Sequence, residues 1–250
     1  MKKFSNRMIY RTQKGQVSAG EAIGILLLDT SVPFIPGDVA NASSYSFPVR
    51  FHKVEGFTVR RAIGKDPAMY DLLREAAGSL VRQGVRAVTG DCGFMGIHQK
   101  KLARELTVPV FLSSLLQIPF ISLLLGDHAK VGVITADARS LNADLLAAVG
   151  VHDAANLVIG GLENQSNFRE FALEETGLLD AEAVEEEVVA VARQMVEQEP
   201  KTAAILLECS LLPPYASAVQ QAVKLPVFDY ITMINYVFAA VVQQQYSGFM

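Results

Sequence analysis

Ala87-Val-Thr-Gly-Asp-Cys92 and Ala204-Ile-Leu-Leu-Glu-Cys209 are two copies of one pattern, a short apolar run that ends in an acid and a cysteine. The two cysteines are the only ones in the chain and are 117 residues apart. Each is followed, 17 residues later, by the proline of a second apolar run, Pro109 or Pro226. A repeat that places a thiol at the same point in each half predicts two related strand–cysteine–helix–strand units around a two-cysteine active site.

Apolar runs and helical patterns alternate on both sides of this repeat. The apolar runs show no polar alternation, which is typical of strands covered on both faces in a parallel sheet. Caps such as Asp66-Pro67 and Asp180, followed by apolar stripes, indicate helices. The expected strands are 23–28, 49–54, 85–90 and 108–112, then 130–135, 157–160, 203–207 and 225–229, and the expected helices are 67–84, 94–106, 140–149, 181–198, a segment after Pro214 and 231–242.

Strands that alternate with helices predict an α/β fold built from parallel βαβ units. We expect two pseudo-symmetric domains, each a parallel sheet flanked by helices, with the active site in the interdomain cleft. The first domain should span residues 1–120 and the second 121–230, with segment 231–250 packing back on the first. Ligands bind at the carboxyl ends of parallel strands, so both thiols should face one cleft.

Composition excludes several classes of function. The chain has 250 residues, a net charge of −4 and a pI of about 5.6, so it lacks the basic face that nucleic acid requires. Its most apolar window, residues 111–125, is interrupted by polar residues and is too short to cross a bilayer. The first 20 residues contain no secretory apolar region. We therefore expect a cytoplasmic protein with free thiols and no membrane or nucleic-acid partner.

The position of the thiols suggests their chemistry. Cys92 and Cys209 each precede an expected helix, whose first backbone N–H groups would point into the cleft. A helix N-terminus binds anions and lowers the pKa of a nearby thiol. A substrate carboxylate could bind these amides while one thiolate removes the adjacent proton and the other thiol returns a proton to the opposite face. This pattern predicts racemisation by general acid–base catalysis.

Other interpretations of the cysteines and their neighbours remain open. A free cysteine is commonly a small buried core residue, although the matched positions favour catalysis. The four histidines show no ligand spacing, and no nucleotide-binding glycine pattern is present, so we expect no metal and no cofactor. Asp91 and Glu208 could orient a cation of the substrate. Because adjacent strand residues point to opposite faces, we slightly favour a structural role for both.

The motifs around the thiols resemble those of the cofactor-independent aspartate/glutamate/hydantoin racemase superfamily. Glu208-Cys-Ser-Leu-Leu-Pro213 is similar to the second-cysteine motif of that group, Gly-Cys-Thr-Glu-Leu-Pro, and Thr89-Gly-Asp-Cys-Gly93 stands in place of the first. The likeness covers nearly the whole chain. It implies that Cys92 and Cys209 are the acid–base pair, and that the protein is a homodimer. It also implies that three residues line the pocket: Asp29, Thr30 and Thr135.

This chain departs from the superfamily motifs where they usually hold the substrate. Gly93-Phe94 replaces Asn-Thr after the first cysteine, and Ser210-Leu211 replaces Thr-Glu or Thr-His after the second. The polar loop 31–48, which contains Asn41, is long enough to be a lid or a binding loop. Arg50 could pair with the second carboxylate of an acidic amino acid, and a salt bridge at the rim is equally plausible. We include all six residues among the expected substrate-binding positions.

The function expected from the sequence is an isomerase, a racemase or epimerase that acts next to the carboxylate of a small substrate. Aspartate or glutamate is the default substrate. Within the superfamily, the alternatives are a hydantoin or allantoin racemase and a maleate-type isomerase, with cysteine-dependent decarboxylation less favoured. An alternative of another class is a small-molecule-binding protein without turnover.

Overall fold

The computed structural model describes residues 9–12 and 14–250, so residues 1–8 and 13 of the first expected domain lie outside it. Two four-stranded parallel sheets are found in this part of the chain, in the orders β2-β1-β3-β4 and β6-β5-β7-β8. The second order is the first one repeated, four strands later. The predicted α/β fold of two pseudo-symmetric halves is therefore confirmed.

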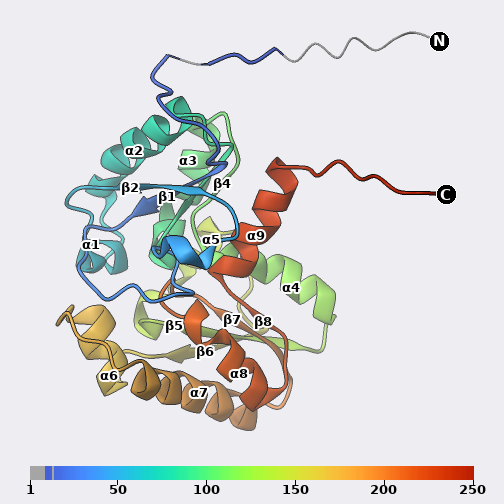
Figure 1. The fold of residues 1–250 in the computed structure, drawn as a ribbon. Helices are drawn as coiled ribbons and strands as arrows, with labels where there is room; N and C mark the ends of the chain where they lie inside the picture. Colours follow the sequence, from blue (N-terminus) through green and yellow to red (C-terminus); the bar gives the residue numbers. More distant parts are fainter. Residues whose placement is uncertain (1–8, 13) are drawn as a thin grey trace.

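The first sheet lies in the upper half of the molecule as drawn, with α2 and α3 beside it (Figure 1). Its strands are β1 (Ile23–Leu27), β2 (Val49–Lys53), β3 (Ala87–Gly90) and β4 (Val110–Phe111). Its helices are α1 (Val59–Ile63), α2 (Tyr70–Arg82) and α3 (Gln99–Glu105), with short 3-10 segments at Ala42–Ser44, Pro67–Met69, Gly93–His98 and Ser114–Gln117.

The second sheet lies below, with α6, α7 and α8 gathered on its lower side (Figure 1). Its strands are β5 (Lys130–Thr135), β6 (Leu157–Gly161), β7 (Thr202–Leu207) and β8 (Val227–Phe228). The helices of this half are α4 (Ile118–Leu125), α5 (Ala143–Ala148), α6 (Ser166–Phe168), α7 (Ala181–Gln198) and α8 (Ala216–Val223), and the chain ends with α9 (Tyr230–Val241). A π-helical turn, Arg169–Leu173, continues α6, and 3-10 segments lie at Ala138–Ser140 and Pro213–Tyr215.

Local chemistry explains where several helices begin. The side chains of Asp66 and Asp180 accept the backbone N–H groups of Ala68 and Ala183, as expected of N-caps. Asp229 forms a full capping box with Thr232 at the start of α9.

The sequence did not indicate α1, α4 or the α6 turn. Two of these are only three to five residues long, too short for an apolar stripe to repeat, and residues 118–125 are apolar except for Ser122, so no polar face marks a helix.

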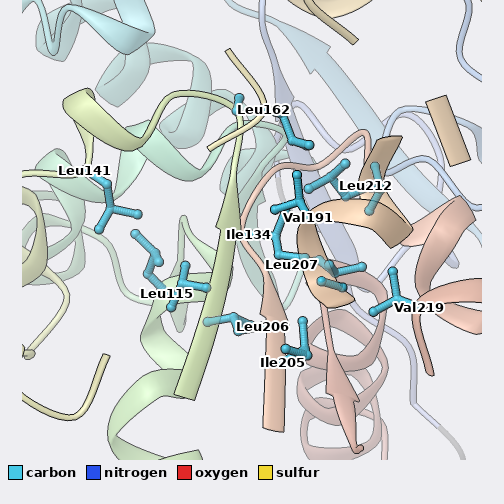
Figure 2. Packing of buried hydrophobic residues seen from close by; sticks show 14 of the residues in the cluster. Leu115, Ile134, Leu141, Leu162, Val191, Ile205, Leu206, Leu207, Leu212 and Val219 are labelled. Carbon is cyan, nitrogen blue, oxygen red and sulfur yellow. The ribbon is translucent and has the colours of Figure 1, made fainter. Parts of the chain in front are cut away.

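The C-terminal helix α9 follows the second sheet in the chain but covers the first. Tyr230, Met233 and Ile234 are buried against Ile23 of β1 and Phe111 of β4. The phenol of Tyr230 also donates a hydrogen bond of 2.9 Å to the carbonyl of Leu112. A separate, larger core fills the second half, where residues of β5, β7 and α7 pack around Ile134 and Leu207 (Figure 2).

Loop 31–48 joins the two halves near the carboxyl ends of the strands. The backbone N–H of Val39 donates to the carbonyl of Ser210 at 3.4 Å. Gly37 packs so closely on Pro214 that a Cβ there would lie 3.0 Å from its Cα, and its φ of +100° also favours glycine. The loop is thus fixed across the interdomain boundary.

Within the described residues, no helix has the length and apolar character needed to cross a membrane.

Candidate active site

One pocket contains both thiols. β3 and β7 each end immediately before an acid and a cysteine, so Cys92 and Cys209 both lie at the carboxyl edge of a sheet. The space between the lining atoms, counted together with the open mouth of the pocket, amounts to about 520 Å³. Seven of the predicted site residues line it: Thr30, Cys92, Gly93, Phe94, Cys209, Ser210 and Leu211.

The remaining wall of the pocket is largely apolar. Val59 and Ile63 come from α1, and Ala172 and Leu173 from the π-helical turn. The other lining residues are Leu28, Val32, Phe34, Ala136, Asp91 and Glu208. No lysine, arginine or histidine belongs to this set of described residues. The pocket therefore combines an apolar wall with two acids and offers no basic side chain to an anionic group.

Four of the predicted substrate-binding residues lie outside the pocket lining. Asp29 accepts the backbone N–H of Gly56 at 2.9 Å and pairs with Lys53. Asn41 caps a 3-10 turn and donates to the carbonyl of Phe34 at 2.9 Å, so it shapes the loop from outside.

Arg50 and Thr135 serve other contacts. Arg50 lies near the amino end of β2, where it pairs with Glu21 at 2.9 Å and donates to Gln83 at 2.7 Å. Arg50 therefore forms a salt bridge, which was the alternative weighed from the sequence. It lies at the amino ends of the strands, opposite to the pocket. Thr135 is fully buried and donates to Glu208 Oε2 at 2.8 Å. It therefore acts on the pocket only through that carboxyl.

The thiols differ from the sequence expectation in their acidity. Burial raises the pKa of Cys92, and the nearby Glu208 and Asp91 raise it further. The backbone N–H groups of Phe94 and Met95 oppose this shift but do not reverse it. Burial also raises the pKa of Cys209, with Glu208 as the next cause. The expected lowering by a helix N-terminus is outweighed because Cys92 opens a 3-10 segment in a pocket that also contains Glu208 and Asp91.

Three buried carboxyl groups surround the thiols. Burial raises the pKa of Asp91 to about 8, that of Asp38 to about 7 and that of Glu208 to about 7. Both oxygens of Asp91 accept the backbone N–H of Leu28, at 3.0 and 3.1 Å, so Asp91 has the structural role favoured from the sequence. Glu208 differs because its Oε1 is buried without a hydrogen-bond partner.

Gly93 makes room for the carboxyl of Glu208. A Cβ at position 93 would lie 1.6 Å from Glu208 Oε1 and 2.9 Å from the carbonyl oxygen of the same residue. Any side chain there would overlap the glutamate. Gly93, where this chain departs from the superfamily motif, is thus coupled to Glu208, the acid that precedes the second cysteine. Ser210 adds a second link across the boundary, because its hydroxyl donates to the carbonyl of Asp91.

These carboxyl groups predict an unusual pH dependence of stability. Asp38, Asp91 and Glu208 have folded-state pKa values above those of the unfolded chain, so between pH 6.5 and 8 the folded state holds more protons. The free energy of unfolding should therefore fall as the pH rises through this window, by roughly 1 kcal/mol per pH unit for each group still protonated. Urea unfolding midpoints at pH 6.5, 7.2 and 8 measure this slope.

The variant Asp91→Asn is the control for this prediction, since it keeps the shape of the side chain and removes its titration. Its slope should be shallower than that of the wild type. A wild-type stability that is flat or rises between pH 6.5 and 8 would contradict the prediction.

Metal ligation finds no support in the side-chain geometry. Across residues 9–12 and 14–250, no three or more histidine, cysteine, aspartate or glutamate side chains are grouped so that they could hold an ion.

No protein-family model matches the chain. Among curated proteins, it is 33% identical over 232 residues to dimethylsulfoniopropionate lyase 5 of Emiliania huxleyi (strain CCMP1516), covering 89% of this chain and 46% of that one. It is 32% identical over 222 residues to the dimethylsulfoniopropionate lyase of Durusdinium sp. clade D, covering 86% of this chain and 73% of that protein. The chain thus spans less than half the length of the first relative and most of the second.

Among solved structures, the chain is similar to allantoin racemase from Pseudomonas fluorescens. The TM-score is 0.58 at 20% identity, over 88% of this chain and 91% of that one. The same fold occurs in arylmalonate decarboxylase and in aspartate and glutamate racemase homologues. The resemblance to the aspartate/glutamate/hydantoin racemase superfamily is therefore confirmed for the fold.

Proposed function

Because the chain belongs to the family of the dimethylsulfoniopropionate lyases, we propose that it is a lyase that removes dimethyl sulfide from a 3-sulfoniopropionate, with Cys92 as the general base. The substrate carries a carboxylate at one end and a sulfonium cation at the other. Its α-proton lies on the carbon between the carboxylate and the carbon that bears the sulfonium, and dimethyl sulfide is a neutral leaving group. The chemistry is a β-elimination.

The proposed reaction needs one base and no oxidant or metal. The Cys92 thiolate takes the proton from the carbon next to the carboxylate. The electron pair of that C–H bond forms the new double bond, and the C–S bond breaks with its electron pair leaving on sulfur. The products are acrylate and dimethyl sulfide. Cys92 is left as the thiol, and its proton passes to solvent when the sulfonium of the next substrate lowers the pKa of the thiol again.

The acid-lined pocket without a basic side chain is the observation that carries this proposal. A second carboxylate, as in aspartate or glutamate, would face Asp91 and Glu208 with no cation to pair with it. Arg50, the expected partner of such a group, is engaged by Glu21. A sulfonium ion instead brings positive charge into the pocket, where it would lower the pKa of the thiol that must ionise.

The surroundings of the two thiols favour Cys92 as the base. The backbone N–H groups of Phe94 and Met95 lower the pKa of Cys92, whereas only that of Leu211 lowers the pKa of Cys209. The pKa of Cys209 is raised further by the proximity of Cys92 and Asp38. Cys92 is thus the thiol that ionises at the lower cost, and Cys209 stays protonated beside it.

A direct assay tests the proposal. Purified protein incubated with dimethylsulfoniopropionate is expected to release dimethyl sulfide and acrylate in equal amounts, measured by gas chromatography and liquid chromatography. A matched sample inactivated with a thiol-alkylating reagent is the control. The absence of both products at millimolar substrate would contradict the proposal.

The racemase expectation remains a prediction that the same protein can test. Aspartate, glutamate and a hydantoin, incubated in D2O, would gain deuterium at the α-carbon if the two thiols acted as an acid–base pair on them. We expect no exchange with the two acidic amino acids, because the pocket offers no basic side chain to their second carboxylate. Rapid exchange with either one, without dimethyl sulfide release from the sulfonium, would favour the racemase.

A further inference from the structure

The side chain of Glu208 has one oxygen that the fold leaves without a partner. Oε2 accepts the hydroxyl of Thr135 at 2.8 Å, and the carboxyl also accepts the backbone N–H of Ala136. Oε1 accepts no hydrogen bond, although the whole residue is shielded from solvent. An unsatisfied buried oxygen costs free energy, so its retention in a pocket wall points to a ligand that satisfies it.

This carboxyl stands at the centre of the two-cysteine site. It follows β7, lines the pocket and lies against Gly93, in the segment that follows Cys92. Its charge contributes to the raised pKa of both Cys92 and Cys209, which line the same pocket. A group bound at Oε1 would therefore be next to the thiols as well.

The charges around Glu208 are predominantly negative. Asp91 also lines the pocket, and Asp38 acts on Asp91 from loop 31–48. The ammonium of Lys65 lies 5.8 Å from the ring centroid of Phe94, but it donates to the carbonyls of Ile63 and Ser140. Positive charge from the ligand would be favoured here, because a low-dielectric wall strengthens its attraction to the acids.

We propose that Glu208 is the residue that recognises the positive charge of an onium substrate, and that it selects sulfonium or ammonium groups over neutral groups of the same shape. This inference rests on the proposed function for its choice of ligand. The apolar residues Val32, Phe34 and Val59 would contact the methyl groups, while Oε1 supplies the negative charge. The carboxylate end of the ligand would extend toward the thiols.

Asp91 provides the internal comparison. Both acids line the pocket and both precede a cysteine, but the oxygens of Asp91 are occupied by the backbone N–H of Leu28. The recognition of charge is therefore assigned to Glu208 and not to its counterpart in the repeat.

The proposal also predicts how binding depends on pH. Burial raises the pKa of Glu208 to about 7, so the free carboxyl is partly protonated near neutral pH. The titratable and hydrogen-bonding groups around it are Thr135, Asp91, both thiols and the phenol of Tyr230, none of which is positively charged. Affinity for a cation should thus rise from pH 6 to pH 8 as the carboxyl ionises, whereas affinity for a neutral isostere should not rise.

Two ligands of matched shape test the proposal without turnover. 3-(Trimethylammonio)propionate carries the cation, and 4,4-dimethylpentanoate has a carbon in place of the nitrogen. Isothermal titration calorimetry at pH 8 should show that wild-type protein binds the zwitterionic trimethylammonio ligand about tenfold or more tightly than 4,4-dimethylpentanoate, whose trimethyl end is uncharged. Glu208→Gln should lose most of this ratio by weaker binding of the cation alone, and Asp91→Asn should keep it.

Each outcome decides a separate point. An unchanged ratio in Glu208→Gln, or its loss in Asp91→Asn instead, would overturn the assignment. If Glu208→Gln fails to fold, the pH series on the wild type still decides, because a cation affinity that stays flat from pH 6 to 8 overturns the proposal. If Glu208 selects the charged ligand but the protein releases no dimethyl sulfide, the proposed lyase activity is wrong and the present inference still holds.

Discussion

Replacing Cys92 by serine is expected to lower kcat for dimethyl sulfide release by about 10³-fold, within the range of 10² to 10⁴ that a general base contributes. A serine hydroxyl nearly matches the thiol in size, so the pocket should keep its shape. Its pKa is far higher than that of a thiol, so the base is lost. Gas chromatography of dimethyl sulfide at saturating substrate measures kcat directly.

Cys209→Ser is the matched variant, because Cys209 lines the same pocket and follows the equivalent strand. Elimination needs a single base, so this variant should lose only about tenfold, through altered packing and charge around the site. Racemisation needs both thiols. Equal and large losses in the two variants would therefore contradict the one-base mechanism, and a larger loss in Cys209→Ser would reverse the assigned roles.

Gly93→Ala is expected to lower kcat/KM by about 100-fold, although it adds only one methyl group. The new Cβ would overlap the carboxyl of Glu208, at 1.6 Å from Oε1. Either the glutamate or the segment after Cys92 must move, and a misplacement of about 1 Å near the reacting atoms costs on the order of 10² in rate. Steady-state kinetics on dimethylsulfoniopropionate, together with urea unfolding, measures both consequences.

A double-mutant cycle shows whether the overlap is the cause. Glu208→Ala removes the colliding carboxyl, so the loss of stability caused by Gly93→Ala should be smaller in that background than in the wild type. Some cost should persist, because the carbonyl oxygen of Glu208 would still lie 2.9 Å from the new Cβ.

Gly78→Ala is the control for a glycine replacement, since this residue lies within α2 and a Cβ there meets only the end of the Arg82 side chain. It should preserve activity and leave stability unchanged or slightly higher.

In the double-mutant cycle, additive effects of the two substitutions at positions 93 and 208 would show that the steric account is wrong.

The periodic parts of the fold were predictable because their physical cause lies in local sequence. Helix α7 has the bounds expected from its Asp180 cap and its buried stripe. Segment 231–242 was expected as a helix and is found as Tyr230–Val241. The short elements α1 and α6 were not predictable, because their positions depend on contacts with distant parts of the chain.

The candidate site was predictable to the extent that it follows strand ends. Cys92 and Cys209 could be placed together because the repeat gives their topology. The apolar wall could not, since Val59 and Leu173 reach the pocket through short elements with little sequence signal. The place of Glu208 in the pocket was also not predictable, because neighbouring side chains on a strand point to opposite faces. That alternation would direct either Glu208 or Cys209 away from the pocket. Both line the pocket because β7 ends at Leu207, just before them.

The return of α9 to the first sheet has a consequence for synthesis on the ribosome. β1, β3 and β4 emerge early, and the apolar face formed by Ile23, Ile25 and Ala87 is covered partly by Val39 and Tyr45 of loop 31–48 and partly by α9. Domains commonly fold in the order in which they are translated. Here part of that apolar face stays uncovered until α9, a helix that is translated after the entire second sheet, has been made.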